Sequence, residues 1–357
     1  MNIVIFGSLF LLLINEYLIY YAVLWSCSWP SDTENKLRVM MLADTHLLGS
    51  RLGHWWDKLR REWQMHRSFQ SAINLFHPQV IFFLGDVFDE GKWCSGEEFE
   101  YYIRRFNSLF YVPQEIRIEV VAGNHDIGFH YAVTPYLRKR FETAFNKKGV
   151  DLISIEGNHF VLVNSVAMEG DECRMCTSAE RELRKLGKAF RCLKENSNCK
   201  EAQELFIDSY SPPILLQHYP LFRESDKICE GSDVALGDEK LVKFREKWDC
   251  LSREATELLL HEIQPRFVFS GHTHHGCNVT HLANISEWSV ASFSWRNRND
   301  PNFLLLTISP KSIDINKCFL PKESTVIYIY EFGIVLILFI EAWQVINKYL
   351  EKYKKSA

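Results

Sequence analysis

Five short apolar segments, each the length of a β-strand, recur through the middle of the chain. They are almost continuously Val, Ile, Leu, Phe or Met, which is typical of strands buried on both faces rather than on one. The segments cover residues 39–43, 80–84, 118–122, 213–217 and 267–270. This pattern predicts an α/β domain whose central strands are covered on both sides.

Two longer apolar segments lie at the ends, at residues 3–25 and 326–346. Each is long enough to span a bilayer. The first has no basic stretch before it and no obvious small-residue cleavage site, so an uncleaved signal anchor is favoured over a cleaved signal peptide. Its central Glu16 either faces a partner helix or makes the span marginal. The expected organisation is an anchor at 1–30, a domain at 31–325, a span at 326–347 and a tail at 348–357.

Lysines follow the second span, at positions 348, 352, 354 and 355. Lysine-rich flanks favour the cytosol, which predicts cytosolic termini and a lumenal domain. Lys354 and Lys355 also resemble the dilysine signal that returns membrane proteins from the Golgi to the endoplasmic reticulum, and that address would make the COPI coat a partner. A plain basic tail is the alternative.

Polar motifs follow directly after each of the five central segments. These motifs are Asp44-Thr-His46, Gly85-Asp86-Val-Phe-Asp89, Gly123-Asn124-His125-Asp126, a single His218, and Gly271-His272-Thr-His274. Sites in open α/β sheets form where strands end, so we expect these side chains to meet. Each motif alone is weak and is explained by a turn or a polar surface, whereas five in succession at strand ends indicate a common site.

The residue types match a pair of metal ions that cleave phosphoesters. Asp86 is the bridging candidate because a carboxylate has two oxygens to share. Asp44, His46, Asp86 and His274 are expected around the first ion, and Asp86, Asn124, His218 and His272 around the second. Nitrogen and oxygen ligands without thiolate suit Mn, Fe or Zn. His125 remains as the general acid, with Asp89 holding its ring.

The order and spacing of these motifs resemble the calcineurin-like metallophosphoesterase superfamily over residues 37–300. The stretches 44–54, 57–65, 89–93 and 123–130 resemble its membrane-bound branch, which includes the yeast cell division control protein 1 group and removes ethanolamine phosphate from glycosylphosphatidylinositol (GPI) anchors. The resemblance implies a four-layer α/β sandwich, two mixed sheets flanked by helices. It also implies two-metal hydrolysis, with Mn favoured.

The expected function is therefore a phosphodiesterase that removes ethanolamine phosphate from a mannose of GPI anchors. Its substrates would be GPI-anchored proteins, whose transport from the endoplasmic reticulum and its exit sites to the cis-Golgi it would promote. Two alternatives stay open: a hydrolase of another lipid-linked or nucleotide phosphoester, and a non-catalytic escort for anchored cargo.

Charge and cysteine content agree with a lumenal hydrolase. The net charge of −4 argues against a nucleic-acid partner. Ten cysteines fit disulfides in an oxidising compartment, and a zinc ribbon around Cys173 and Cys176 is the alternative. The sequons at Asn278 and Asn284 predict glycosylation without showing which is used.

Two segments of the domain have open roles. Residues 168–211 are expected to be an insertion between strands of a second sheet, with a helix at 179–194. That helix either covers the active site or packs far from it. Near the end of the domain, Arg296 is interpreted as a surface residue in preference to a phosphate contact.

Overall fold

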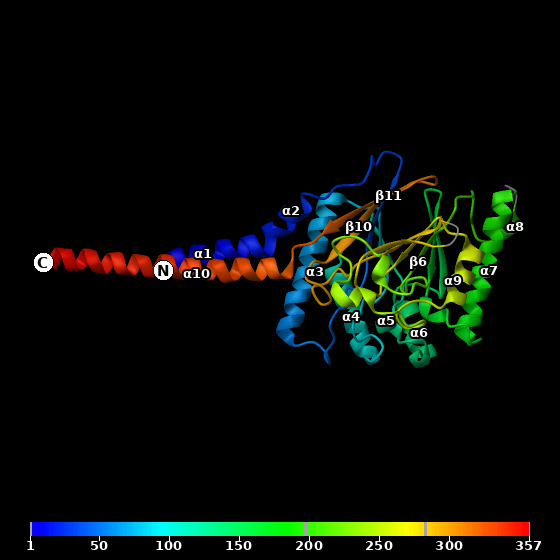
Figure 1. Cartoon of the computed structure of the whole chain (residues 1–357), viewed down its shortest axis with the longest axis horizontal. Helices are drawn as coiled ribbons and strands as arrows, with labels where there is room; N and C mark the ends of the chain where they lie inside the picture. The colour runs from blue at the N-terminus through cyan, green and yellow to red at the C-terminus, as the bar shows by residue number, and fades with distance from the viewer. Residues whose placement is uncertain (1, 196–198, 282–283, 357) are drawn as a thin grey trace.

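Two mixed β-sheets stack face to face with helices on their outer sides, in a computed structural model that describes residues 2–195, 199–281 and 284–356 (Figure 1). The first is five-stranded, in the order β11-β10-β1-β2-β3. Its strands β1, β2 and β3 run parallel to one another, and β10 and β11 are antiparallel additions. Their bounds are β1 Leu37–Leu42, β2 Val80–Phe83, β3 Arg117–Val120, β10 Asn302–Ile308 and β11 Ile313–Phe319.

The second sheet is six-stranded, in the order β4-β5-β6-β7-β9-β8. The run from β5 to β9 is parallel, and an antiparallel strand pairs with each end of it. The bounds are β4 Val150–Ile155, β5 Asn158–Val163, β6 Ile214–Gln217, β7 Phe267–Ser270, β8 Cys277–Thr280 and β9 Ser286–Ser289. All five central segments predicted from the sequence are strands of these two sheets.

Alternate side chains of the central strands enter two different cores, which explains why the strands are apolar throughout. In β1, Val39 and Met41 pack between the sheets with Phe82 of β2 and Phe160 of β5. The intervening Met40 points to the opposite face and packs under the helices. A strand covered on both faces has no solvent side, so polar residues are excluded from it until it ends.

Helices cover the outer face of each sheet (Figure 1). The helices α3 (Trp55–Phe76) and α4 (Gly96–Leu109) lie on the first sheet, and α7 (Arg174–Glu195) and α9 (Arg253–Ile263) lie on the second. The expected four-layer sandwich is thus confirmed. The shorter helices are α5 Asn124–Ile127, α6 Pro135–Ala144 and α8 Lys200–Gln203, with turns η2 His130–Ala132, η3 Ser165–Ala167, η4 Asp226–Ile228 and η5 Gly237–Leu241.

The insertion lies between β5 and β6 of the second sheet, as predicted, and α7 contains its expected helix. Arg184 and Arg191 of α7 both bind the Glu262 carboxylate of α9, each at 3.1 Å. The helix therefore packs on the outer layer beside α9, and the interpretation that places it away from the metal ligands is correct.

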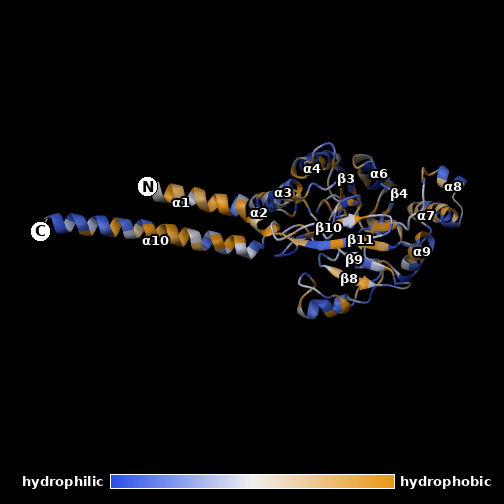
Figure 2. Cartoon of the chain, turned by 90° about the horizontal axis from the view of Figure 1, so that it is seen from above, coloured by the Kyte–Doolittle hydropathy of each residue, from blue (hydrophilic) through white to orange (hydrophobic). Residues whose placement is uncertain are grey.

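The two ends of the chain leave the domain side by side as long helices (Figures 1 and 2). The N-terminal one consists of α1 (Asn2–Leu13), a π-helical turn η1 (Ile14–Leu18) and α2 (Ile19–Leu24), and the C-terminal one is α10 (Glu323–Ser356). Residues Val4–Leu24 and Glu323–Lys355 are long and apolar enough to cross a membrane. The second helix continues through the predicted tail, whose last residue lies outside the described residues.

Close contacts join the two helices along their length. A Cβ added to Gly7 would lie 2.9 Å from Ile337, and one added to Gly333 would lie 2.5 Å from Leu11. The Tyr330 hydroxyl donates a hydrogen bond to the Glu16 carboxylate across the pair. Glu16 thus faces a partner helix, one of its two predicted roles.

Eight of the ten cysteines are paired, as Cys27–Cys318, Cys173–Cys176, Cys192–Cys199 and Cys229–Cys277. Cys94 and Cys250 are free and buried. The Cys27–Cys318 bond joins the segment that follows the N-terminal helix to β11. The pairing of Cys173 with Cys176 favours disulfides over a zinc ribbon.

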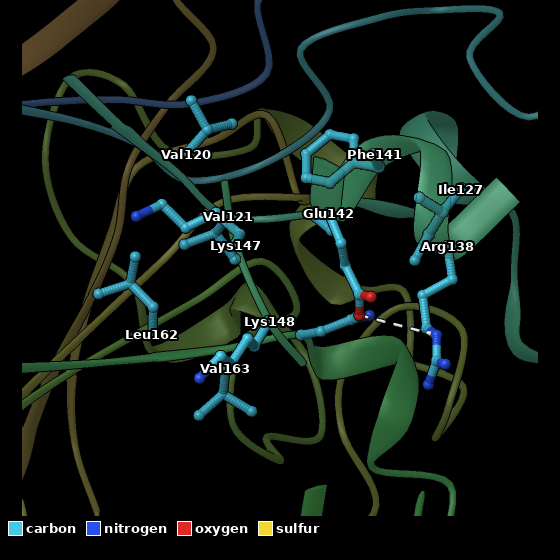
Figure 3. Close-up of a pocket in the computed structure, with 12 residues that line it drawn as sticks. Val120, Val121, Ile127, Arg138, Phe141, Glu142, Lys147, Lys148, Leu162 and Val163 are labelled. Carbon is cyan, nitrogen blue, oxygen red and sulfur yellow. Dashed lines mark ion pairs between the residues drawn. The ribbon is translucent and has the colours of Figure 1, made fainter. Parts of the chain in front are cut away.

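A small cavity lies between β3, β5 and α6 (Figure 3). Its water-accessible space is about 20 Å³, bounded by Val121, Phe141 and Val163 with an Arg138–Glu142 ion pair beside them. That space holds about one water molecule and no substrate.

Candidate active site

The ends of five parallel strands from both sheets converge at one edge of the sandwich. Asp44 follows β1, Asp86 follows β2, Asn124 follows β3, His218 follows β6 and His272 follows β7. The backbone N–H of Asp44 donates to the Gly85 carbonyl at 3.2 Å, and that of Gly271 donates to the His218 carbonyl at 2.9 Å. Neighbouring strand ends are thus tied together, and all nine predicted site residues meet here.

Five of these residues have a left-handed backbone, which non-glycine residues seldom adopt. Their φ angles are 53° for Asp44, 44° for His46, 48° for Asp86, 74° for His272 and 62° for His274. Each such residue costs about 1–3 kcal/mol and persists only where its surroundings hold it. Here the holding contacts include the His46 N–H on the Asp86 carbonyl at 3.0 Å and the His272 N–H on the Asp44 carboxylate at 2.9 Å.

Glycines are required where two of the motifs approach other ligands. Gly85 has a φ of 91°, and a Cβ there would lie 2.5 Å from Nδ1 of His218. A Cβ on Gly123 would lie 2.2 Å from Oδ1 of Asp86. Any larger residue at either position would displace a metal-ligand candidate.

Four electron-pair acceptors face one another around the second predicted metal position. His218 Nδ1 donates to the Leu84 carbonyl at 2.8 Å, so Nε2 of its neutral ring carries a lone pair. His272 Nε2 donates to the Trp248 carbonyl at 2.7 Å, which leaves the lone pair on Nδ1. These two nitrogens lie 3.2 Å apart. Asn124 Oδ1 and Asp86 Oδ2 lie 3.2 and 3.3 Å from the His218 nitrogen.

The first predicted position has a similar arrangement. His46 Nδ1 donates to the Asp89 carboxylate at 3.0 Å, so its Nε2 faces inward, 3.1 Å from Nε2 of His274. Asp86 Oδ2 lies 3.5 Å from that His46 nitrogen, and Asp44 Oδ1 lies 3.8 Å from it. Asp44 Oδ1 is buried and has no hydrogen-bond partner among the described residues. Facing acceptors of this kind repel unless a cation lies between them, so the residues fit two divalent ions that share Asp86.

The pKa values of the histidines also indicate that the buried carboxylates favour positive charge at this site. Burial opposes a charged ring, but the nearby carboxylates of Asp44, Asp89 and Asp86 outweigh it and raise the pKa of His46 to about 10. Burial likewise opposes charge on His218, whose pKa Asp86 raises to about 9. Burial lowers the pKa of His272 to about 3, with nearby His218 adding to the effect. Without metal, protons therefore take part of the place of the cations.

His125 lies at the rim of this constellation and is partly exposed. Its backbone N–H donates to Asp86 Oδ1 at 2.7 Å, and its ring Nδ1 donates to the backbone carbonyl of Asp89 at 2.9 Å. The Asp89 carboxylate is farther from this ring, at 3.6 Å, because it accepts from Nδ1 of His46. Asp89 therefore orients the His125 ring through its main-chain carbonyl, and it also orients the His46 ring through its carboxylate.

Arg296 is part of this network, so the preferred surface interpretation is wrong. Its Nη2 lies 3.2 Å from Oδ2 of Asp89, and Asp89 is almost completely buried. The segment that follows β9 turns back toward the site, where Ser292 and Asn297 both donate to the Asp44 carbonyl. Asp89 alone thus lies between Arg296 and the candidate metal ligand His46.

Two further contributors were missed in the sequence. Asp126 is buried and accepts from the N–H groups of Phe88 and Gly123, each at 2.9 Å, which ties the second motif to the third. It belongs to a quoted motif and could have been singled out there. The Trp248 carbonyl fixes the tautomer of His272, but Trp248 lies 24 residues away in the sequence and no local signal marks it.

A model of calcineurin-like phosphoesterases matches residues 37–276, a range that contains every one of these ligands. The chain therefore belongs to the calcineurin-like phosphoesterase family and is a metal-dependent phosphoesterase. Family membership implies two divalent metal ions, in agreement with the two sets of facing acceptors.

Vertebrate proteins named Metallophosphoesterase 1 are similar to this chain over most of its length. The protein of Danio rerio is 48% identical over 323 residues, covering 88% of this chain and 84% of the relative. The protein of Xenopus laevis is 48% identical, covering 93% and 86%, and that of Gallus gallus is 49% identical, covering 88% and 82%. The family resemblance drawn from the motifs is thus confirmed.

Solved structures give a more distant likeness. A dimetal phosphatase from Danio rerio is 13% identical with a TM-score of 0.46, covering 80% of this chain and 99% of that one. A purple acid phosphatase from yellow lupin is 11% identical with a TM-score of 0.47, covering 81% and 52%. The assignment to the family therefore rests on the sequence relatives.

Proposed function

We propose that this protein is a manganese-dependent phosphodiesterase that removes ethanolamine phosphate from a mannose of GPI anchors. One observation supports phosphodiester hydrolysis by two metal ions. Asp86 lies between two sets of facing acceptors, one that contains His46 and His274 and one that contains His218 and His272. A phosphodiester whose oxygens reach both positions would be held at two points. Oxygen and nitrogen ligands without thiolate suit Mn, Fe or Zn, and the motif resemblance favours Mn.

Asp44, His46, Asp86 and His274 would hold one ion, and Asp86, Asn124, His218 and His272 the other. When bound, such a pair polarises phosphoryl oxygens and makes a bound water acidic enough to attack phosphorus. The acceptors behind His46, His218 and His272 take the outer ring N–H, so the inward nitrogen of each neutral ring carries the lone pair that a metal ion needs. No nucleophilic side chain is needed, so the phosphorus is attacked directly by water.

His125 would supply the proton to the departing oxygen. Its Nδ1 is committed to the Asp89 carbonyl, so only Nε2 is left to exchange a proton with substrate. Burial lowers the pKa of His125. In its charged form the ring is therefore a stronger acid than free histidine, and this form carries the Nε2 proton that an alkoxide leaving group needs.

The substrate and location are supported by the ends of the chain and by the motif resemblance. Both termini leave the domain on the same side as apolar helices (Figure 2), which fits a domain held against a membrane by two spans. The lysines at the end of α10 favour a cytosolic tail and a lumenal domain. Asn278 and Asn284 are exposed, which suits glycosylation in the lumen. These features support a place in the endoplasmic reticulum and cis-Golgi, with retrieval by the COPI coat.

Mass analysis of GPI glycans in cells that lack this protein tests the proposal. We expect anchors that retain the side-branch ethanolamine phosphate, with removal restored by the wild-type chain and not by Asp86→Ala. An unchanged glycan pattern refutes the substrate. If Asp86→Ala restored transport of anchored proteins, the chain would act as an escort, and its metals would have no catalytic role.

A further inference from the structure

An apolar cavity of about 670 Å³ lies where the two terminal helices meet the domain. Its walls come from the N-terminal helix, the first half of α3, the start of α10 and the segment after β9. The residues that form its apolar surface include Leu12, Leu59, Trp63, Trp295, Ile327 and Ile334. This volume falls within the range of small-molecule sites.

The cavity is nearly as deep as one membrane leaflet. Along the N-terminal helix its lining runs from Leu12 to Tyr20, eight residues or about 12 Å of helix. Half of the hydrocarbon core of a bilayer is about 15 Å. The cavity thus extends from the domain end of the helix pair to roughly the middle of the expected span.

Its apolar lining remains open to the surroundings. Leu12, Leu59 and Ile334 are 47%, 54% and 51% exposed. Exposed tryptophans continue along α3 at Trp55 and Trp56. Tryptophan gathers at the boundary between hydrocarbon and head groups, so this edge of α3 suits the surface of the leaflet.

Two charged groups at the cavity are already paired, and most of the remaining lining is apolar, which suits an apolar occupant. Glu16 accepts from the Tyr330 hydroxyl, and the Arg60 guanidinium pairs with the Glu323 carboxylate. The π-helical turn at Ile14–Leu18 brings Glu16 to Tyr330 at this point. Such turns inside helices are frequently found at functional sites.

From these observations we infer that the cavity binds one acyl chain of a bilayer phospholipid from the leaflet beside the domain. The inference rests on the membrane placement proposed above and not on the GPI substrate. A lipid tail fits because an unfilled groove in hydrocarbon loses its dispersion contacts, whereas a tail provides them. Arg60 at the rim would lie at the level of the head group.

The bound chain would lie next to the support of the active site. Trp295 forms one wall of the cavity, where its indole N–H donates to the Pro321 carbonyl at 2.9 Å. The next residue is Arg296, whose guanidinium holds the Asp89 carboxylate. An acyl chain bound in the cavity would therefore restrict the motion of the segment after β9, which contains Arg296.

Photolabelling of the full chain in dioleoylphosphatidylcholine vesicles tests this site. The probe is a phosphatidylcholine with a diazirine in its acyl chain, and mass spectrometry locates the labelled residues. We expect labels concentrated near Leu59, Trp63 and Ile327. Leu59→Trp, which fills the cavity, should reduce them at least fivefold. Leu338→Trp, the same change at an exposed position of α10 outside the cavity, should leave them unchanged.

Two measurements on the same sample separate the possible failures. Retention in carbonate-washed vesicles reports membrane insertion, and manganese-dependent hydrolysis of bis(p-nitrophenyl) phosphate reports the folded site. Labels spread evenly around both helices in an inserted, active protein would refute the lipid site alone. Labelling by a GPI lipid but not by phosphatidylcholine would assign the cavity to substrate and also refute it. A chain that does not insert would refute both the lipid site and the membrane placement.

Discussion

Arg296 offers a sharp test of how the metal ligands are supported. Its guanidinium lies 3.2 Å from the Asp89 carboxylate, which lies 3.0 Å from Nδ1 of His46. In Arg296→Met the carboxylate loses one of its two charged partners. Removing one member of a buried pair costs about 3–5 kcal/mol. Arg296 is 31% exposed and Asp89 keeps His46, so we expect about 1–2 kcal/mol in stability.

The effect on catalysis should exceed that on folding. Groups that orient a metal ligand typically change metal affinity or activity about 10–100-fold when removed. We therefore expect kcat/KM for bis(p-nitrophenyl) phosphate to fall by about that factor at subsaturating Mn, with part of the loss recovered at higher Mn. Arg296→Lys should have a kcat/KM below that of wild type, because lysine keeps the charge but lacks the planar guanidinium that makes two parallel hydrogen bonds.

Three measurements separate this role from a direct substrate contact. Metal content by plasma mass spectrometry should fall in Arg296→Met, whereas loss of a substrate contact alone would raise KM and leave metal content unchanged. Arg253→Met, which removes an exposed arginine from a surface ion pair, is the matched control and should keep full activity. If Arg296→Met retained its metal and kcat/KM within twofold, the supporting role would be refuted.

The other predictions concern the candidate metal ligands, the general acid, the metal ions and the Cys27–Cys318 disulfide. Asp86→Ala should lose both metals and nearly all turnover, as measured by metal content and aryl phosphodiester hydrolysis; one retained metal would refute bridging. His125→Ala should keep metal but lose about 10²–10⁴-fold in rate on alkyl phosphodiesters and much less on aryl ones; equal losses would refute the acid role. Chelation should abolish activity reversibly and remove about 2.7 kcal/mol of stability per site occupied at a hundred times its Kd, read as a lower Tm; an unchanged Tm would contradict coupling of the site to folding. Cys318→Ser should cost about 2–5 kcal/mol in thermal unfolding of the detergent-solubilised chain, and an unchanged Tm would show that the Cys27 link is dispensable.

The central strands could be predicted because each is buried on both faces and therefore reads as an unbroken apolar run. The edge strands β8 and β11 could not, although β3, at the other edge of the first sheet, could. In β11 the Asp314 and Asn316 side chains alternate with Ile313 and Ile315, and β8 is only Cys277–Thr280. A short strand with one covered face is determined by its neighbour in the sheet, and that neighbour is distant in the sequence.

The metal ligands could be predicted for a different reason. Their chemistry restricts them to few residue types, and each follows a strand whose end is visible in the sequence. Arg296 and Trp248 carry no such restriction: one acts through a salt bridge to Asp89 and the other through its carbonyl. Contacts made by backbone atoms or by common surface residues depend on the folded path of the chain, so a motif cannot reveal them.

The Cys27–Cys318 bond fastens both terminal helices to one point of the domain, directly after α2 and shortly before α10. A domain attached to a membrane by one flexible linker would vary widely in its distance from the bilayer and in its orientation. A domain whose two membrane attachments are joined by a disulfide would keep a nearly constant distance from the bilayer surface. The enzyme would then select substrates by the distance of their phosphate from the bilayer as well as by their chemistry. In a GPI substrate, lengthening the glycan between the lipid and the cleaved phosphate should consequently impair cleavage as much as changing the sugar that carries the phosphate.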